Sequence, residues 1–598
     1  MIFHFRIILI IAIMLSSLGF ALDTANLAPP DALFFISLSD PAFIQKVRET
    51  GLIDRLYDAQ TGFGGNASPC DHLKNWAADL QVSYDEWARI FPGAQCCYLT
   101  DLEFSSSGEP VFNITFIMEH NGNREQASAI IEKLTSQISP DAKKGSFVHN
   151  GAQVFTVDHT IRKSGKIESS RRLERKSPEA SSSSGKVVKS EVLRELSFHF
   201  QYAFSDGFLF FCEGNGEPIK DLIDRFKSPG FSSLSQVKTY RLLFENASHE
   251  NSARIYFNLE EILSRFAAFQ KKEGKDISSL SLMDFKGLGI YQYSVSDSLM
   301  SCIRLYAPSE RTGICDALFQ FSPNPFSSLK FVPHDTIAYS SVSLDLYRIY
   351  HVLLGAASSL YPQEVATLRQ TIQANNALLG VDLENQILGE IKGEMGYYIR
   401  SSTESSGRNK TAEAYFIEVA NPDLFKQRLK KLFLFAKNSL AMEMKGKMLL
   451  DVEYWSPAPM GQSVGSDDFI PPFGIFMYDK YLFVSTDIAE IQDLITRLKS
   501  GEVDVAFSGG VKEFMERRPK TDCVGVRIIH QPASPSLYKG FHTLAGNIDP
   551  GNPVRALLEH GSQVAHAQSL MTMIYQNQDM LSIIMEIPFS GKLRKNSR

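Results

Sequence analysis

Two distant stretches of this chain share one pattern of residues. The first, 29–38, reads Pro-Pro-Asp-Ala-Leu-Phe-Phe-Ile-Ser-Leu, and the second, 333–342, reads Pro-His-Asp-Thr-Ile-Ala-Tyr-Ser-Ser-Val. Pro matches Pro, Asp matches Asp and apolar residues match apolar residues, so each stretch is typical of a turn that leads into a buried strand. Two copies of one module divide a long chain and make the elements of each copy easier to recognise.

Further pairs of segments match in the same order along the chain. The pairs are 93–99 with 393–399, 206–227 with 479–499, and 289–303 with 573–584. The second pair predicts a tight turn, a buried strand and an amphipathic helix that ends in Lys-Ser, and the third predicts a hairpin. We therefore expect two related modules, 22–320 and 321–598, joined near Pro323-Asn324-Pro325.

The spacing of apolar residues predicts the elements of both modules. We expect strands at 32–38, 94–104, 111–119 and 413–420, and helices that begin at Asp40, cover 73–91 and 124–138, and run from Asn421 to Phe433. Strand pairs joined by short turns and interleaved with helices indicate an α+β fold. Each module should contain a mostly antiparallel sheet with helices packed on one face.

The N-terminal 21 residues have the pattern of a secretory signal peptide. A short region with His4 and Arg6 precedes the apolar run 7–15, and Gly19-Phe20-Ala21 offers small residues for cleavage near Ala21. We expect a protein that is exported to the periplasm or the extracellular space; retention of this segment as an anchor is the alternative. No later segment has the roughly 20 apolar residues that a membrane-spanning helix needs.

Composition excludes one class of partner. The chain has 598 residues, 44% of them hydrophobic, with a formal net charge of −6. It lacks the basic excess that is typical of nucleic-acid binding, so no nucleic acid is expected. The segment 162–191 combines paired Arg and Lys residues with a run of four serines and few apolar residues. It is predicted to be a disordered basic loop within the first module, solvated rather than bound to an anionic polymer.

The seven cysteines are scattered and show no metal-binding spacing. The second copy has Gly396 and Tyr397 where the first has Cys96 and Cys97, so we interpret these two cysteines as ordinary strand residues. An oxidising compartment permits disulfides, but the sequence does not pair them.

Motifs for catalysis lack the context that their chemistry needs. Residues 461–465 satisfy G-x-S-x-G, yet prolines surround them where a nucleophile elbow needs a strand, a sharp turn and a helix. Ser-x-x-Lys occurs at 183/186, 327/330 and 536/539 without its companion motifs. The glycines at 62–65 lack the rest of a phosphate loop, and His560 and His566 do not have the i, i+4 spacing of two ligands on one helix. Adjacent carboxylates such as Glu260-Glu261 should point apart.

We therefore assign no catalytic, cofactor-binding or metal-binding residue and no cofactor, and we expect that the chain is not an enzyme. A catalytic site assembled from residues that meet only in the fold stays open.

Residues 29–41 and the segments that follow them resemble the start of the domain of unknown function 3352 family. The resemblance continues through the strand and helix at 112–134, the hairpin strand 151–157 and the strand at 206–209. Members of that family are exported bacterial proteins without an assigned activity, and the resemblance spans most of the chain as two tandem copies. Its motifs are structural, so it implies no catalytic residues.

The most direct functional hypothesis is a non-catalytic binding or structural protein of the cell envelope, with an envelope protein or polymer as its partner. The alternatives are an exported hydrolase and a carrier of an apolar ligand. A hydrolase predicts a polar pocket with a perturbed acid, base or nucleophile, a carrier predicts a dry cavity, and a binding protein predicts an exposed apolar patch. The sequence leaves the oligomeric state open.

Overall fold

The computed structural model describes most of the chain, and its elements fall into two compact units. Unit 1 holds the described residues up to Leu234, and unit 2 holds those from Ser235 onward. The described residues are 24–38, 89–91, 94–104, 110–120, 122–138, 143–166, 191–214, 218–228, 232–245, 247, 252–272, 281–295, 298–403, 409–440, 442–457, 473–501, 522–529 and 570–588. The predicted signal peptide at 1–21 and the predicted helix at Asp40 lie outside them.

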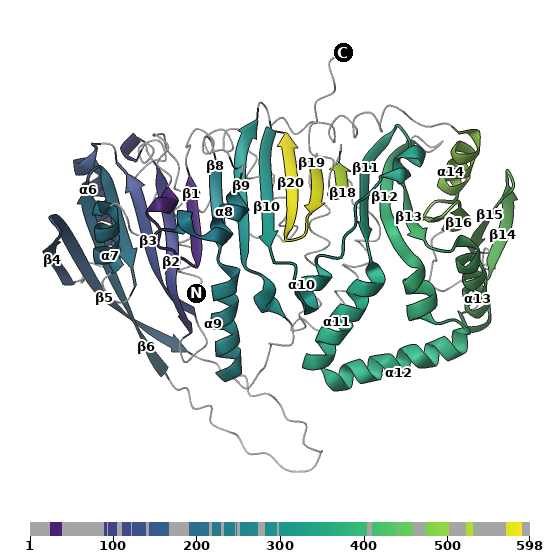
Figure 1. Ribbon diagram of the computed structural model, residues 1–598, viewed down its shortest axis with the longest axis horizontal. Coiled ribbons are helices and arrows are strands. Elements are labelled where there is room, and N and C mark those ends of the chain that lie inside the picture. Colours follow the sequence, from purple (N-terminus) through teal and green to yellow (C-terminus); the bar gives the residue numbers. More distant parts are fainter. Residues whose placement is uncertain are drawn as a thin grey trace, which may run out of the picture. The chain divides into compact units, whose positions relative to one another are not determined.

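Unit 1 contains an antiparallel sheet of seven described strands (Figure 1). In spatial order they are β1 (Phe34–Leu38), β2 (Gln95–Phe104), β3 (Pro110–Glu119), β7 (Phe208–Glu213), β6 (Glu191–Ser205), β5 (Ala152–Lys166) and β4 (Lys143–His149). The turn between β6 and β7 is Asp206-Gly207, and both residues have positive φ, at 47° and 88°. This two-residue turn matches the right-handed twist of the strands that it joins.

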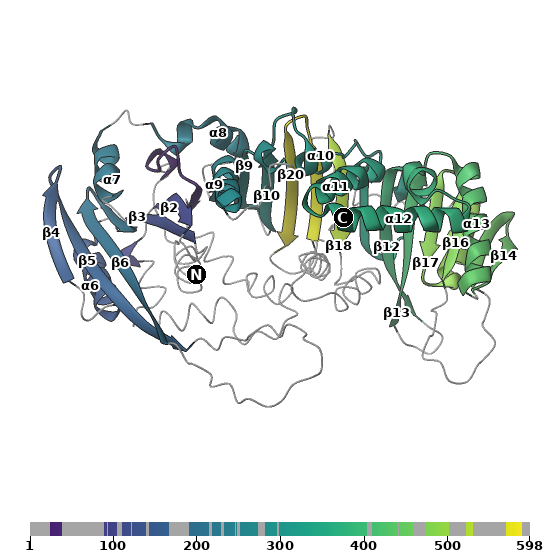
Figure 2. The ribbon, with the colours of Figure 1, turned by 90° about the horizontal axis from the view of Figure 1, so that it is seen from below.

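Two helices of unit 1 pack on opposite faces of this sheet (Figure 2). Helix α7 (Pro218–Lys227) places Phe226 against Phe208 and Phe210 of β7. Helix α6 (Arg124–Ile138) lies on the other side, where Arg124 contacts the ring of Phe204. Successive residues of a strand point to opposite faces, and Phe204 pairs with Leu209, between Phe208 and Phe210.

Strands β5 and β6 extend beyond the rest of the sheet as a two-stranded ribbon. Residues 159–166 of β5 pair with 191–198 of β6, and neither segment pairs with another described strand. The predicted loop at 162–191 therefore begins later than expected, because the ladder continues to the pair Lys166↔Glu191. Residues 167–190 lie outside the described part of the chain.

Unit 2 contains an antiparallel sheet of thirteen described strands. In spatial order they are β8 (Ser252–Phe257), β9 (Gly287–Val295), β10 (Ser298–Tyr306), β20 (Met580–Pro588), β19 (Leu570–Gln576), β18 (Cys523–Ile529), β11 (Thr336–Leu344), β12 (Ile391–Thr403), β13 (Asn409–Val419), β17 (Tyr481–Ser485), β16 (Gly474–Tyr478), β15 (Val452–Pro457) and β14 (Met444–Leu449). Its described α-helices are α8 (Lys238–Phe244), α9 (Leu259–Lys272), α10 (Gly313–Ala317), α11 (Leu346–Leu360), α12 (Pro362–Leu379), α13 (Pro422–Leu440) and α14 (Ile488–Ser500).

Helices α13 and α14 also cover opposite faces of their sheet. Phe483 of β17 belongs to the cluster that contains Ile491 and Leu494 of α14. Its neighbour Leu482 packs instead with Phe425 and Leu429 of α13. The predicted α+β class and antiparallel sheet are confirmed. The expectation of helices on a single face is wrong, because the strands here carry apolar side chains on both sides.

Several predicted elements are confirmed at or near their predicted bounds: strands at 94–104 and 111–119, the helix at 124–138, and both hairpins that were predicted to close the modules. Asn421 caps α13, since its side-chain oxygen accepts a hydrogen bond from the Leu424 amide at 3.1 Å. Cys96 and Cys97 are buried strand residues of β2 as predicted, and the six cysteines in the described ranges are free thiols. Cys70 lies outside those ranges, as does most of the helix predicted at 73–91.

The two units share one strand order over seven strands. The order β1-β2-β3-β7-β6-β5-β4 in unit 1 corresponds to β11-β12-β13-β17-β16-β15-β14 in unit 2. The register agrees with the sequence match, since Ser37 pairs with Cys96 as Ser341 pairs with Gly396. This agreement supports the two-copy interpretation, which stays a prediction together with its module limits at 22–320 and 321–598.

Candidate functional site

Unit 1 contains a cavity of about 350 Å³ between one sheet face, helix α7 and the turn before β1. Its lining is mostly polar and comes from four separate stretches of sequence. The lining residues are Pro29, Asp31, Tyr98, Thr100, Asp101, Asn113, Thr115, Pro218, Lys220, Asp221 and Arg225. A volume of this size lies at the lower end of the range of small-molecule sites.

Two cross-strand pairs form the floor of the cavity. Tyr98 pairs with Thr115, and Thr100 pairs with Asn113, between β2 and β3. Because alternate residues of a strand share a face, these four side chains lie together on the α7 side of the sheet. The Thr115 hydroxyl donates to the Sγ of Cys212 on β7 at 3.6 Å. The floor of the cavity is therefore polar.

A bulge and a glycine position Asn113. The register of β2 and β3 shifts between Thr100 and Glu103, and Asp101 there has a φ of 55°. This bulge turns the Asp101 carboxylate toward the Asn113 amide, which donates to it at 2.9 Å. On the other side, Gly214 has a φ of 143°, and a Cβ there would lie 1.9 Å from Asn113 Oδ1. Only glycine leaves room for Asn113 in this position.

Helix α7 provides one wall, and its Arg225 reaches the floor. The Arg225 Nη2 donates to the Tyr98 hydroxyl at 3.1 Å. Burial raises the pKa of Tyr98, although the nearby Arg225 guanidinium opposes that shift, so the hydroxyl stays protonated and can donate in turn. The Arg225 Nε is buried and has no hydrogen-bond partner among the described residues. A buried N–H without a partner costs free energy, which a bound acceptor would recover.

The corresponding helix of unit 2 has nearly the same sequence. Residues 219–228 read Ile-Lys-Asp-Leu-Ile-Asp-Arg-Phe-Lys-Ser, and 491–500 read Ile-Gln-Asp-Leu-Ile-Thr-Arg-Leu-Lys-Ser, so seven of ten residues are identical. This alignment places Arg497 where unit 1 has Arg225. The strand register places Tyr398 where unit 1 has Tyr98. The same contact recurs, because Arg497 Nη2 donates to the Tyr398 hydroxyl at 3.2 Å.

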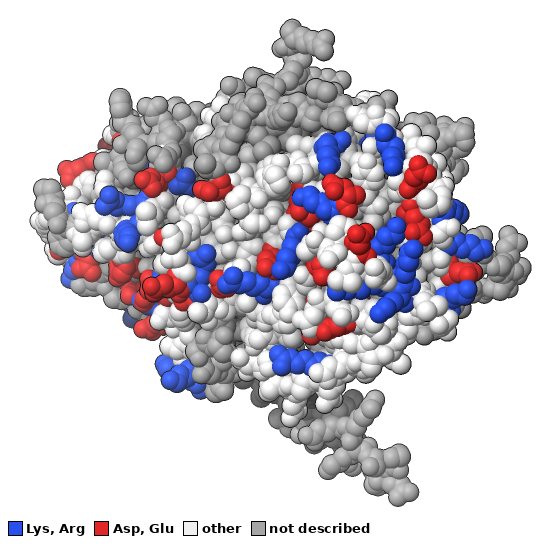
Figure 3. Space-filling view, turned by 45° about the vertical axis from the view of Figure 1, so that its right-hand side comes forward, with Lys and Arg blue, Asp and Glu red and all other residues white. Residues whose placement is uncertain are grey.

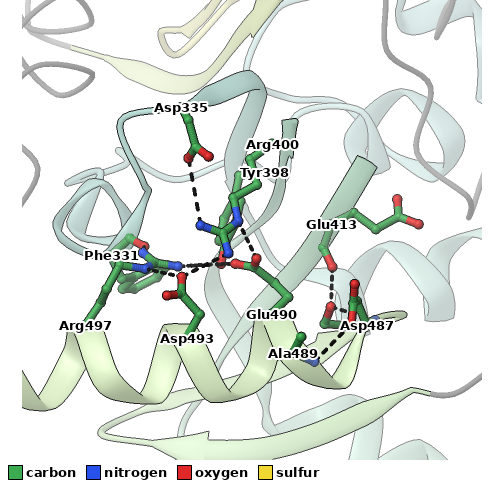
Figure 4. A network of polar contacts seen from close by, with 11 residues as sticks. Phe331, Asp335, Tyr398, Arg400, Glu413, Asp487, Ala489, Glu490, Asp493 and Arg497 are labelled. Atoms are coloured by element: carbon green, nitrogen blue, oxygen red, sulfur yellow. Dashed lines mark hydrogen bonds and ion pairs between the residues drawn. The ribbon is translucent and has the colours of Figure 1, made fainter. Parts of the chain in front are cut away.

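In unit 2 an ion pair lies between the corresponding helix and sheet (Figure 4). Arg400 of β12 and Glu490 of α14 approach to 2.5 Å between Nε and Oε2, although the N–H is not aimed along a hydrogen-bond direction. Glu490 also accepts from the Tyr398 hydroxyl at 2.5 Å and lies 3.2 Å from Arg497 Nη2. Asp487 caps α14 by accepting from the Ala489 amide at 2.9 Å, and this fixes the turn that carries Glu490.

Two aspartates complete this unit 2 cluster. Arg400 Nη2 lies 3.0 Å from Asp493 and its Nη1 lies 3.9 Å from Asp335. Arg497 Nε donates to Asp493 at 2.9 Å. Burial raises the pKa of Glu490, while the Tyr398 hydroxyl and the two guanidinium groups oppose the shift. The cluster is compact and internally paired, as buried charges must be.

The two units differ at the two positions that carry the ion pair. By strand register, Thr100 of unit 1 corresponds to Arg400 of unit 2. By the helix alignment, Pro218 of unit 1 corresponds to Glu490 of unit 2. Neither Thr nor Pro can supply a charge or fill the volume of the long side chain that it replaces. The cavity of unit 1 is therefore lined by the positions that correspond to Arg400 and Glu490 of unit 2.

Unit 2 has a second buried carboxylate, which is fully satisfied by its own surroundings. Glu394, which is 1% exposed, accepts from the hydroxyls of Ser328, Ser341 and Tyr481 at 2.5, 2.7 and 2.8 Å. It also accepts from the Ser328 amide at 3.0 Å. With every oxygen engaged, this carboxylate is structural.

The sequence motifs do not meet in a site. Ser327 and Lys330 lie on one short 3-10 helix, and Lys330 is 3.6 Å from Asp479. Glu260 and Glu261 point apart as predicted, toward Lys286 and Arg265. The other motifs lie outside the described residues: 62–65, 183/186, 461–465, 536/539, His560 and His566.

Within the described ranges, no group of three or more His, Cys, Asp or Glu side chains is arranged to hold a metal ion. In the same ranges, no helix has both the length and the apolar character to cross a membrane. On the face seen in Figure 3, basic and acidic side chains alternate, so the described residues there form no large field of one sign.

No family model and no curated protein matches this chain. Crystal forms IV, I and III of TP0453 are similar to it over 47%, 49% and 50% of its length and 79%, 80% and 84% of theirs. The identities are 9–10% and each TM-score is 0.22, which is too low to carry an argument about fold or function. The resemblance to the domain of unknown function 3352 family stays a prediction.

Proposed function

We propose that this chain is an exported, non-catalytic binding protein of the cell envelope that holds a small polar ligand in the unit 1 cavity. The observation that carries the proposal is the cavity itself, about 350 Å³ with a mostly polar lining. Export is supported by the signal-peptide pattern at 1–21.

The lining favours binding over catalysis and over transport of an apolar ligand. It contains neither His nor Cys, and Asp101 is held by the Asn113 amide rather than beside a nucleophile. General acid–base catalysis needs a titratable group aimed at the proton that it moves. A carrier of an apolar ligand needs a dry, apolar lining, whereas this cavity presents carboxylates, hydroxyls, an amide and a guanidinium.

The test compares the wild-type protein with a variant whose cavity is filled. Thr100→Arg/Pro218→Glu copies the unit 2 pair into unit 1, and Ser228→Ala, at the exposed end of α7, is the matched control. Each protein is titrated by calorimetry with the dialysable fraction of a cell-envelope extract. We expect binding heat from the wild type and the control and none from the filled variant.

Equal heats from the wild type and the filled variant would overturn binding through this cavity. The bound material is then recovered and compared by mass spectrometry with the starting extract. Recovery of an unaltered ligand supports a binding role, and a chemically altered ligand would favour the hydrolase alternative.

A further inference from the structure

The geometry points to a small zwitterion as the ligand of the unit 1 cavity: a molecule that carries a carboxylate beside a cationic nitrogen group. This inference rests on the proposed function and names the chemical class of the ligand. It comes from the second unit, where the corresponding positions hold one carboxylate and one guanidinium in contact.

Arg225 and Tyr98 are placed to bind the carboxylate. Their counterparts in unit 2, Arg497 and Tyr398, both contact the Glu490 carboxylate, at 3.2 and 2.5 Å. Arg225 holds the Tyr98 hydroxyl in the same way as in unit 2, at 3.1 Å, and its buried Nε lacks a partner among the described residues. A guanidinium with free N–H groups and a protonated phenol are strong donors to a carboxylate.

Asp31 and Asp221 are placed to bind the cation. Their counterparts in unit 2, Asp335 and Asp493, lie 3.9 and 3.0 Å from the Arg400 guanidinium. Both Asp31 and Asp221 line the cavity, and both are exposed to solvent. Neither makes an ion pair or a side-chain hydrogen bond with another residue in the described part of the chain. A cationic nitrogen group between them would take the place of Arg400.

The correspondence with the Arg400–Glu490 pair favours a ligand with both groups. Arg400 and Glu490 together are neutral, so their absence from unit 1 leaves the aspartates on one side and Arg225 on the other. A ligand that is only an anion would leave the Asp31 and Asp221 carboxylates without a cation. A ligand that is only a cation would leave Arg225 without a carboxylate partner. A zwitterion would place an acceptor at the buried Arg225 Nε, which lacks a partner among the described residues, and a cation beside the two exposed aspartates.

The strand residues that form the floor of the unit 1 cavity are more polar than the corresponding residues of unit 2. Unit 1 has Asn113 and Thr115 where the register of unit 2 places Ala412 and Ala414. Both alanines are buried, at 2% and 0% exposure, beneath the ion-paired cluster. An amide and a hydroxyl give the unit 1 floor additional hydrogen-bonding groups for a polar guest.

The test uses a matched set of probes titrated into the full-length protein by calorimetry. Guanidinoacetate carries a guanidinium and a carboxylate as close neighbours, as in the Arg400–Glu490 pair. Methylguanidinium carries the cation alone, acetate carries the anion alone, and glycine replaces the guanidinium with an ammonium group. We expect guanidinoacetate to bind at least tenfold more tightly than methylguanidinium or acetate. The comparison with glycine identifies which cation the aspartates prefer.

Variants assign the two ends of the ligand. Arg225→Gln and Asp221→Asn should each reduce the affinity for guanidinoacetate about tenfold or more, since each removes one charge while preserving size. Ser228→Ala should leave that affinity unchanged. Thr100→Arg/Pro218→Glu should abolish binding and raise the midpoint of thermal unfolding, because its new side chains pair with Arg225 and the aspartates. A rise in the midpoint shows that this variant is folded.

The outcomes separate the two proposals. Equal affinity for guanidinoacetate and a singly charged probe overturns the zwitterion, and the proposed function then stands if the filled variant still loses the heat of the envelope extract. No detectable guanidinoacetate binding also overturns the zwitterion. If the extract binds the filled variant as well as the wild type, the proposed function itself fails.

Discussion

At the residue scale, the ion-paired cluster of unit 2 determines how much stability is lost when one member of the Arg400–Glu490 pair is removed. Glu490 is 1% exposed and contacts Arg400, Arg497 and Tyr398. Removal of one partner from a buried pair leaves the other charge without compensation, at a cost of about 3–5 kcal/mol. Removal of both Arg400 and Glu490 costs less, because Arg497 still pairs with Asp493.

We therefore predict a strongly non-additive double-mutant cycle. Glu490→Ala should lower the free energy of unfolding by about 3–5 kcal/mol, and Arg400→Thr/Glu490→Ala should lower it by less. Urea unfolding followed by circular dichroism measures both. Asp493→Asn, at a side chain that is 41% exposed, is the control and should cost about 1 kcal/mol. The cycle also needs Arg400→Thr alone, and a double variant whose cost equals the sum of the two single costs would show that the pair is not coupled.

The cavity residues also mark the limit of what the sequence could predict. Thr100 and Pro218 lie on different elements, and neither belongs to a motif with a chemical signature. Their significance depends on the strand register, which aligns Thr100 with Arg400, and on the helix repeat, which aligns Pro218 with Glu490. The matching helices were visible in the sequence, but the cavity between helix and sheet was not, because a void has no sequence pattern.

At the scale of elements, two corresponding hairpins differ in the residues of their turns. The β4–β5 turn is Asn150-Gly151, with φ values of 45° and 75°, and the β14–β15 turn is Leu450-Asp451, with φ values of 48° and 64°. Asn-Gly is the favoured sequence for this turn, whereas a left-handed conformation costs leucine about 1–2 kcal/mol. The Leu450 side chain is 51% exposed, so little burial offsets that strain.

Replacement of the strained turn should stabilise the protein. Leu450→Asn/Asp451→Gly should raise the free energy of unfolding of unit 2 by about 1 kcal/mol, measured by urea unfolding. The reverse change in unit 1, Asn150→Leu/Gly151→Asp, should destabilise by more. It would also remove the hydrogen bond from the Asn150 amide to Asp224, which is 3.2 Å long. No gain from the first variant would mean that the Leu450-Asp451 turn is not under strain.

The elements that the sequence predicted are those with a regular apolar period. Helix α6 and its neighbouring strands were predicted at their observed positions because Ala127, Ile130 and Ile131 form one buried face. Helix α12 was not predicted, and among its 18 residues only Val365 is buried. A helix that is exposed on nearly all sides has no apolar stripe from which it could be recognised.

At the scale of the whole molecule, both units bury free thiols whose ionisation opposes folding. Burial raises the pKa of Cys212 in unit 1 to about 12 and that of Cys523 in unit 2 to about 11, from a usual value of 9.0. The folded state keeps these thiols protonated where the unfolded chain releases the protons. Their contribution to stability is thus complete below pH 9 and is lost as the pH rises from 9 through 11 to 12.

We predict that Cys523→Ala weakens the loss of stability in alkali. Between pH 8 and pH 10.5, Cys523 should account for about 2 kcal/mol of the decrease in the free energy of unfolding. The measurement is urea unfolding of the wild type and of Cys523→Ala at both pH values, compared as differences so that the cost of the substitution itself cancels. Identical decreases in the two proteins would show that this thiol is ionised equally in the folded and unfolded states.

The two-stranded ribbon formed by β5 and β6 extends far beyond the rest of the unit 1 sheet. Its eight unshared residue pairs, at about 3.3 Å per residue, carry the chain about 26 Å past the last strand that either partner shares. Lys166 and Glu191 therefore lie at the far end of an arm as long as a small domain is wide. None of the residues that line the cavity belongs to this arm, so the tip of the arm and the cavity are separate surfaces of unit 1.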